Sequence, residues 1–208
     1  MKGQLYWEEG KLFRLCEWGM RLAYVNVLWF FFTFAGLVVA GIAPSSISLF
    51  TVMRKWLTGQ EDIPVFQTFF STYKKEFWRT NAIGFVLGTG AGVLFLDFLF
   101  MTYTKGILSL ILLAFLLMIT MFYFIVCLYI FPVYVHYHLR VVDYIKHSFF
   151  IGIANPATTL TLTISVILLG MLFLSIPALI PFYGASLCSL IVMKGALKCF
   201  RKIEGKLS

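Results

Sequence analysis

Long stretches of the chain contain no charged side chain, and they give the first expectation about its structure. Between Arg21 and Arg54 lie 32 residues without Asp, Glu, Lys or Arg, and 46 such residues separate His147 from Lys194. A helix needs about 20 residues to cross a bilayer, because it rises about 1.5 Å per residue through a core about 30 Å thick. The pattern therefore predicts five membrane-spanning helices, at about residues 22–43, 80–104, 107–131, 156–176 and 177–193.

Three further segments are amphipathic, and each is predicted to lie at the membrane surface. Residues 1–21 mix charged side chains with leucines at helical spacing and lead into the first span. Segment 64–79 carries one aromatic helical face, which consists of Phe66, Phe69, Phe70, Tyr73 and Phe77. The tail, 194–208, has an apolar face with Leu197, Phe200, Ile203 and Leu207, and a basic face that is expected to meet lipid headgroups through Lys194, Lys198, Arg201 and Lys202.

Proline and charge positions predict how the segments are ordered across the membrane. Pro44 and Pro132 are expected to end the first and third spans, because proline breaks the helical hydrogen-bond ladder. Five spans place twelve Lys and Arg residues on one side and five on the other, so the C-terminus is expected in the cytoplasm and the N-terminus outside. In an alternative with six segments, residues 45–53 complete a short hairpin and both termini are cytoplasmic.

The composition agrees with a membrane protein and excludes two other classes. Of the 208 residues, 61% are hydrophobic and 12% are charged, and the mean hydropathy is +0.91. A soluble domain is about 45–50% apolar and about 25% charged, so this chain has too little charge to cover a surface in water. Intrinsic disorder requires low hydrophobicity and is also excluded. The expected fold is all-α, a single polytopic helical domain over residues 1–208.

Net charge, cysteines and motifs narrow the function classes further. The net charge is +8, but the basic residues gather at the ends of the predicted spans, where they meet anionic lipid, so nucleic acid is not an expected partner. The four cysteines form no CxxC pair, and neither a metal site nor a cofactor is expected. The longest segment between spans, from Pro44 to Thr80, is too short for a catalytic domain. The chain is therefore not expected to be an enzyme.

Two features inside the predicted second span are candidates for function. Gly84, Gly88 and Gly92 form a stripe that lets another helix approach closely, either from the same chain or from a partner. Asp97 is an acidic residue inside a span, where a carboxylate is costly and often functional. It could orient the helix through hydrogen bonds, couple ions or protons, or contact a partner.

The chain resembles the YesL-like family of bacterial polytopic membrane proteins, which carry a domain of unknown function. The resemblance covers about residues 20–200 and is carried by Asn26-Val27-Leu28-Trp29, GIAPSS at 41–46, Arg54-Lys55-Trp56, Gly59, Pro64-Val65-Phe66, Phe69-Phe70, Lys74, Asp97, Phe131-Pro132 and Asn155-Pro156. It implies a plasma-membrane protein of Gram-positive bacteria, whose gene often lies beside oligosaccharide importers. It implies no catalytic residues.

Two functions remain open at this point. The first is an accessory subunit that binds the permease of an ABC importer for oligosaccharides, which the glycine stripe and the family's gene neighbourhood favour. The alternative is a small autonomous carrier or channel that uses Asp97 and hydroxyls of the fourth span.

Overall fold

The computed structural model describes residues 2–101, 103 and 106–205, and these residues form helices and short connections without a strand. The helical fold predicted from the sequence is confirmed. The elements in chain order are α1 (Lys2–Ala35), α2 (Val39–Leu57), α3 (Val65–Met101), α4 (Ile107–His136), α5 (Val141–Ala154), α6 (Pro156–Ser175), the 3₁₀ turn η1 (Pro177–Leu179) and α7 (Ile180–Glu204).

The predicted first span, 22–43, is divided between two helices. Helix α1 ends at Ala35, and the chain reverses at Gly36–Val38, where Leu37 and Val38 adopt positive φ angles of 59° and 62°. The reversal depends on glycine, because a Cβ on Gly41 would overlap the Thr33 backbone. The expectation that Pro44 ends the span is wrong, since this residue lies inside α2. The glycines, which let α1 and α2 approach, set the boundary instead.

The predicted surface helix, 64–79, and the predicted second span are one continuous helix, α3. The sequence between them has no glycine or proline to break the helix, and the side chains of Thr80 and Asn81 donate to the Glu76 and Phe77 carbonyls one turn earlier, each at 2.9 Å. Its 37 residues make α3 about 55 Å long, which exceeds the bilayer core. The predicted end of the span at residue 104 lies outside the described residues.

Two other boundaries also differ from the expectation. Helix α4 continues through Pro132 to His136, so the prediction that this proline ends the third span is wrong. The predicted fifth span and the basic tail form one helix, α7, which continues to Glu204. The starts of the third and fourth spans are confirmed, because α4 begins at Ile107 and α6 begins at Pro156. Residues 206–208 of the tail, including Leu207, lie outside the described part.

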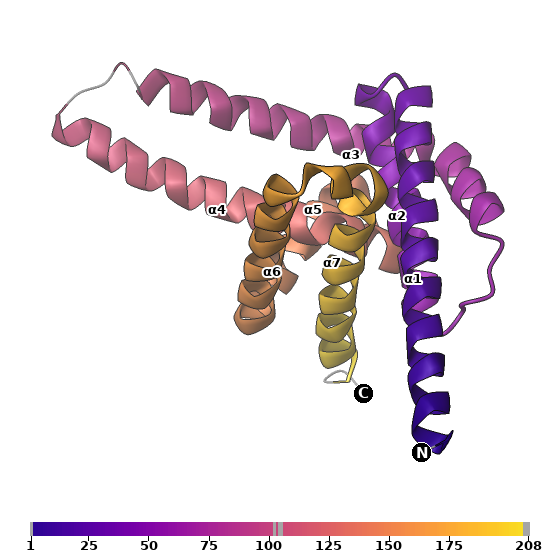
Figure 1. Cartoon of the computed structure of the whole chain (residues 1–208). Helices are drawn as coiled ribbons and strands as arrows, with labels where there is room; N and C mark the ends of the chain where they lie inside the picture. The colour runs from indigo at the N-terminus through magenta and orange to yellow at the C-terminus, as the bar shows by residue number, and fades with distance from the viewer. Residues whose placement is uncertain (1, 102, 104–105, 206–208) are drawn as a thin grey trace.

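Helices α3 and α4 form a long hairpin that projects from the rest of the molecule (Figure 1). Its surface is apolar, with large exposed side chains that include Phe85, Phe95, Phe98, Ile107 and Leu110. Only 6% of the most apolar 18-residue stretch of α3 is buried within the protein. Four of the described helices are long and apolar enough to cross a membrane: α3, α4, α6, and α7 together with η1. This much exposed apolar surface is compatible with lipid and not with water.

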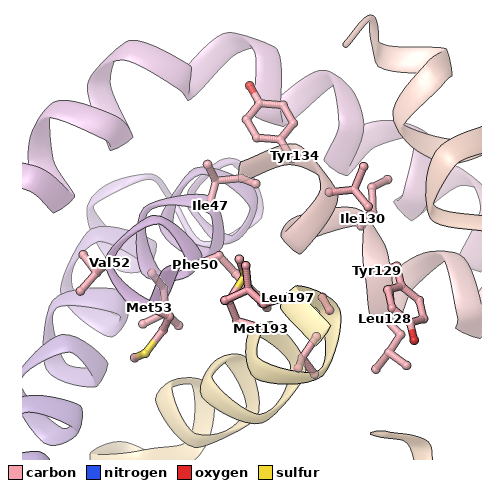
Figure 2. Packing of buried hydrophobic residues seen from close by; sticks show 14 of the residues in the cluster. Ile47, Phe50, Val52, Met53, Leu128, Tyr129, Ile130, Tyr134, Met193 and Leu197 are labelled. Atoms are coloured by element: carbon pink, nitrogen blue, oxygen red, sulfur yellow. The ribbon is translucent and has the colours of Figure 1, made fainter. Parts of the chain in front are cut away.

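The buried core lies where α2, α4 and α7 meet. Figure 2 shows Phe50 of α2 close to Met193 and Leu197 of α7, with Ile130 of α4 beside them. The apolar face of the predicted tail is part of this core, because Ala196, Leu197 and Phe200 are buried. The expectation that this face lies on lipid is therefore wrong for Leu197 and Phe200. The helix has no breaking residue after the fifth span and continues along the protein.

Both termini lie at the same end of the molecule (Figure 1). At this end the Trp18 and Trp56 rings meet edge to face at 5.8 Å, joining α1 to the end of α2. His136 Nε2 lies 3.0 Å from Glu204 Oε1, which joins the end of α4 to the end of α7. The reversal between α1 and α2 produces this arrangement, in which the termini share one end as in the six-segment alternative, although only four of the described helices are long and apolar enough to cross a membrane.

Candidate functional site: a basic pocket and an apolar hairpin

A polar pocket of about 330 Å³ lies where α2 ends, α4 ends and α5 begins, against the first half of α3. Four cationic side chains line it, and they are Arg54, Lys55, Lys75 and Arg79. Its other polar groups are Thr51, Ser71, Thr72, Glu76, Tyr134, His138 and Tyr144. We call this site the basic pocket.

Helical periodicity brings the lining residues of α2 and α3 to the pocket. Thr51, Arg54 and Lys55 are spaced i, i+3 and i+4 on α2, so they share one face. On α3 the residues 71, 72, 75, 76 and 79 follow the same rule. The aromatic face of this segment points elsewhere and holds α3 in place. Phe69 is fully buried, and its ring stacks on Phe32 of α1 at 5.3 Å.

Phe32 lies among four rings of the aromatic face, at 6.3 Å from Phe66, 5.8 Å from Phe70 and 5.0 Å from Tyr73. The Tyr73 hydroxyl also donates a hydrogen bond to the Phe32 carbonyl at 3.1 Å. The expectation that this face lies flat on lipid is therefore wrong for Phe69, and the face attaches α3 to α1. Phe77 continues the aromatic row, with its ring 5.5 Å from that of Tyr73.

The cations of the basic pocket are not neutralised by acidic partners. Among the described residues, none of the four cations has a carboxylate within the 4.0 Å of an ion pair. The carboxylate of the pocket, Glu76, accepts a hydrogen bond from the Tyr134 hydroxyl at 2.6 Å. In Figure 2 this hydroxyl points away from the apolar core. The pocket therefore carries an excess of positive charge.

Two arginines are held in position by the end of α4 and the loop that follows it. Arg54 Nη1 donates to the Val135 carbonyl at 3.1 Å, while Arg54 Nε is buried and has no partner among the described residues. Arg79 donates to the Leu139 carbonyl, and its guanidinium lies 5.7 Å from the ring centres of both Tyr134 and Tyr144. Such contacts orient a guanidinium without removing its charge.

Tyr144 fixes the loop that closes this side of the pocket. Its hydroxyl accepts a hydrogen bond from the Leu139 amide at 3.1 Å and donates one to the Tyr137 carbonyl at 3.2 Å. Burial, and then the nearby Glu204 carboxylate, raises the pKa of Tyr137, so its phenol stays neutral at physiological pH. The two hydrogen bonds of the Tyr144 hydroxyl tie the loop to α5 beside the cations.

The glycine stripe is only partly covered by the protein itself. A Cβ on Gly84 would lie 3.0 Å from the Ala43 Cβ of α2, so this glycine is packed against another helix. A Cβ on Gly88 or Gly92 would have nothing within 4 Å. Helix α3 instead approaches α4 closely at Gly90, where an added Cβ would lie 3.0 Å from the Tyr123 ring. Two of the three predicted packing residues therefore face open space.

Asp97 lies on the exposed surface of the α3–α4 hairpin, away from the basic pocket. Among the described residues, no hydrogen bond or ion pair orients its carboxylate. The hydroxyls of α6 bond mostly within their own helix. Thr161 donates to the Ala157 carbonyl at 2.8 Å, and Ser165 donates to the Thr161 carbonyl at 2.8 Å.

The basic residues of the predicted tail remain exposed on α7, and they are Lys194, Lys198, Arg201 and Lys202. Lys194 and Lys198 border a shallow groove together with Thr158, Thr161 and Ser165 of α6. Among the residues that the structure describes, no three His, Cys, Asp or Glu side chains form a cluster that could hold a metal ion.

A buried asparagine connects the two ends of the chain. Asn26 of α1 is fully buried, and its Nδ2 donates to the carbonyls of Ile180 and Pro181 at 3.2 and 2.7 Å. Its Oδ1 accepts from the amides of Ala185 and Ser186 at 2.9 and 3.0 Å. Every hydrogen-bonding group of this amide is therefore used, which makes its role structural.

The sequence interpretation missed the basic pocket, although part of its signal was visible. The charged positions 75, 76 and 79 repeat at helical spacing, and Arg54-Lys55 closes an apolar run. The sequence did not indicate that these segments meet Tyr134 and Tyr144, which lie more than 50 residues further along the chain. Their contact depends on how three helices end at one place.

The exposed apolar helices define the class: this is an all-α membrane protein with several spanning helices. A family profile described as "Protein of unknown function, DUF624" matches residues 22–98, which include α2 and the part of α3 that lines the basic pocket. The chain belongs to the YesL-like family that this profile describes. No solved structure matches it.

Three relatives from Bacillus subtilis (strain 168) are similar over most of their length. The uncharacterized protein YteU is 40% identical over 94% of this chain and 87% of its own. The uncharacterized protein YesV is 37% identical over 94% of each chain. The uncharacterized protein YesL is 38% identical over 91% of this chain and 89% of its own.

Proposed function

We propose that the chain is a non-catalytic subunit of the cell membrane that docks to the permease of an ABC importer for oligosaccharides. The observation that supports this function best is the uncovered glycine face of α3. Gly88 and Gly92 lie on the projecting apolar hairpin (Figure 1), and a Cβ on either would have no atom of the described residues within 4 Å. In lipid, where apolar surface alone does not drive association, such small-residue faces are where helices of two proteins approach. The importer as partner follows from the family resemblance.

In this proposal the end that carries both termini and the basic pocket faces the cytoplasm. Segments 2–21, 54–79 and 194–202, which the proposal assigns to this end, contain most of the Lys and Arg residues of the chain. The positive-inside rule favours the cytoplasm for such basic segments. The glycine face of the hairpin then meets the permease within the bilayer, and the basic end remains accessible from inside the cell.

The test is co-purification in mild detergent from native membranes, with uptake of oligosaccharide measured in parallel. The variant Gly88→Leu/Gly92→Leu fills the uncovered face and is expected to lose the permease. Gly170→Leu is the matched control, because Gly170 on α6 also has nothing within 4 Å of its Cβ position. If the wild-type chain captures no permease and its deletion leaves uptake unchanged, the proposal is wrong.

The carrier alternative has less support. A transport site normally gathers several polar groups near the middle of the membrane, whereas Asp97 lies exposed on the hairpin without such a cluster around it. Uptake by the purified protein in liposomes, if abolished by Asp97→Asn, would favour the carrier over the docking subunit.

A further inference from the structure

The basic pocket has the chemistry of an anion site, and this inference does not depend on the proposed importer. We propose that it binds a phosphate group, carried either by an anionic glycerophospholipid or by a soluble phosphate ester. Its four cations, Arg54, Lys55, Lys75 and Arg79, come from two helices and border one cavity.

The charge balance is the first argument. None of these cations has a carboxylate partner among the described residues, and the Glu76 carboxylate is occupied by Tyr134 at 2.6 Å. Like charges that line one cavity repel each other, and an anion placed between them relieves this repulsion. Two guanidiniums and two ammoniums also match the oxygens of a phosphate, which accept several charged hydrogen bonds at once.

The shape and the lining of the cavity are the second argument. About 330 Å³ is more than a phosphate group alone would fill, so the cavity leaves room for an attached polar group. Hydroxyls of Thr51, Ser71 and Thr72 border it, and each donates its proton to a backbone carbonyl of its own helix. Their oxygens remain available to accept hydrogen bonds from the hydroxyls of a glycerol or a sugar.

The position in the fold is the third argument. Arg54 and Lys55 follow the apolar part of α2, Tyr134 lies near the end of the apolar helix α4, and the apolar part of α3 begins after Arg79. The pocket therefore lies where three apolar stretches stop, at the base of the α3–α4 hairpin, and a hairpin that crosses the bilayer brings this base to the depth of the lipid phosphates. Basic pockets between membrane helices on the cytoplasmic side are typical binding sites for anionic headgroups.

The experiment compares two variants with the same change in charge. Lys55→Gln/Lys75→Gln removes two pocket cations whose side chains make no hydrogen bond to a described residue, while Lys74→Gln/Lys146→Gln removes two exposed cations outside the pocket lining. The purified proteins, in a non-ionic detergent, are titrated with dihexanoyl-phosphatidylglycerol, with the zwitterionic dihexanoyl-phosphatidylcholine as reference. Inorganic phosphate is titrated alone and as a competitor.

We expect phosphatidylglycerol to bind the wild type, and the pocket variant to bind it about 30-fold more weakly. The control variant is expected to bind as the wild type does. Competition by millimolar inorganic phosphate would identify a soluble phosphate as a sufficient ligand, and binding of the lipid without such competition would identify the headgroup.

The inference is wrong if neither anionic probe binds, if phosphatidylcholine binds equally well, or if both double variants lose binding alike. A thermal melt of each variant checks its fold. If the double variant does not fold, the single substitutions Lys55→Gln and Lys75→Gln serve instead, and each is expected to weaken binding about fivefold.

Discussion

Substitution of Asn26 by leucine is expected to loosen the contact between the two ends of the chain. The side chain of Asn26 makes four hydrogen bonds to the beginning of α7, at 2.7–3.2 Å. Leucine has a similar size but makes none of them, and it leaves two carbonyls and two amides of α7 without these partners. The perturbation therefore removes the polar contacts while it keeps the branched shape of the side chain.

The magnitude follows from the number of bonds. Hydrogen bonds between membrane helices contribute about 0.6 kcal/mol on average and about 1.7 kcal/mol at most. Four of them give about 2–4 kcal/mol for Asn26→Leu, after allowance for the apolar surface that leucine adds. Asn81→Leu is the control, because Asn81 makes a single bond to Phe77 of its own helix and is expected to cost less than about 1 kcal/mol.

The assay is reversible unfolding of the purified protein in mixed micelles, by titration with sodium dodecyl sulfate and detection of helicity and tryptophan fluorescence. A free energy of unfolding for Asn26→Leu within about 0.5 kcal/mol of the wild type would refute the reasoning. It would mean that water or neighbouring groups replace the asparagine at no cost.

Three further predictions concern packing, the basic pocket and topology. Gly195→Ala places a methyl group against Leu162 and should lower the free energy of unfolding by about 1–2 kcal/mol. The control Gly170→Ala adds its methyl group in open space and should not lower this free energy. Equal stability of the two variants would contradict the close contact of α6 and α7. Tyr134→Phe removes the bond to a carboxylate and should cost about 1–3 kcal/mol in the same titration, against no change for the exposed Tyr24→Phe. A variant with Cys16 as its single cysteine should react with a membrane-impermeant maleimide in inside-out vesicles and not in intact cells, since Cys16 is exposed on α1 and precedes the apolar run that begins at Leu22. Labelling of intact cells would place the N-terminal segment outside.

Hydropathy was sufficient to predict the class and the apolar helices, because a membrane imposes length and composition directly on the sequence. The starts of α4 and α6 were also predictable, since Gly106 and Asn155-Pro156 mark them locally. The other boundaries were not, because the sequence patterns there were ambiguous. Pro44 and Pro132 indicated helix ends, but both residues lie inside helices, where membrane proteins tolerate proline.

The partners of the amphipathic faces could not be read from periodicity either. An aromatic face such as that of Phe66–Phe77 has the same spacing whether it lies on lipid or on another helix. The difference is made by Phe32, which is separated from this segment by a whole helix and meets it only because the chain reverses at Gly36–Val38. A second connection, residues 58–64 between α2 and α3, brings Arg54 and Lys55 beside Lys75 and Arg79, so the basic pocket depends on that turn.

The central claim is that acyl chains, and not water, surround the apolar hairpin of α3 and α4. The most direct test removes the surfactant from the purified protein and follows its molar mass by size-exclusion chromatography with light scattering. Without detergent or lipid we expect aggregation and loss from solution. A stable, monodisperse particle of 23.8 kDa in plain buffer would contradict the claim.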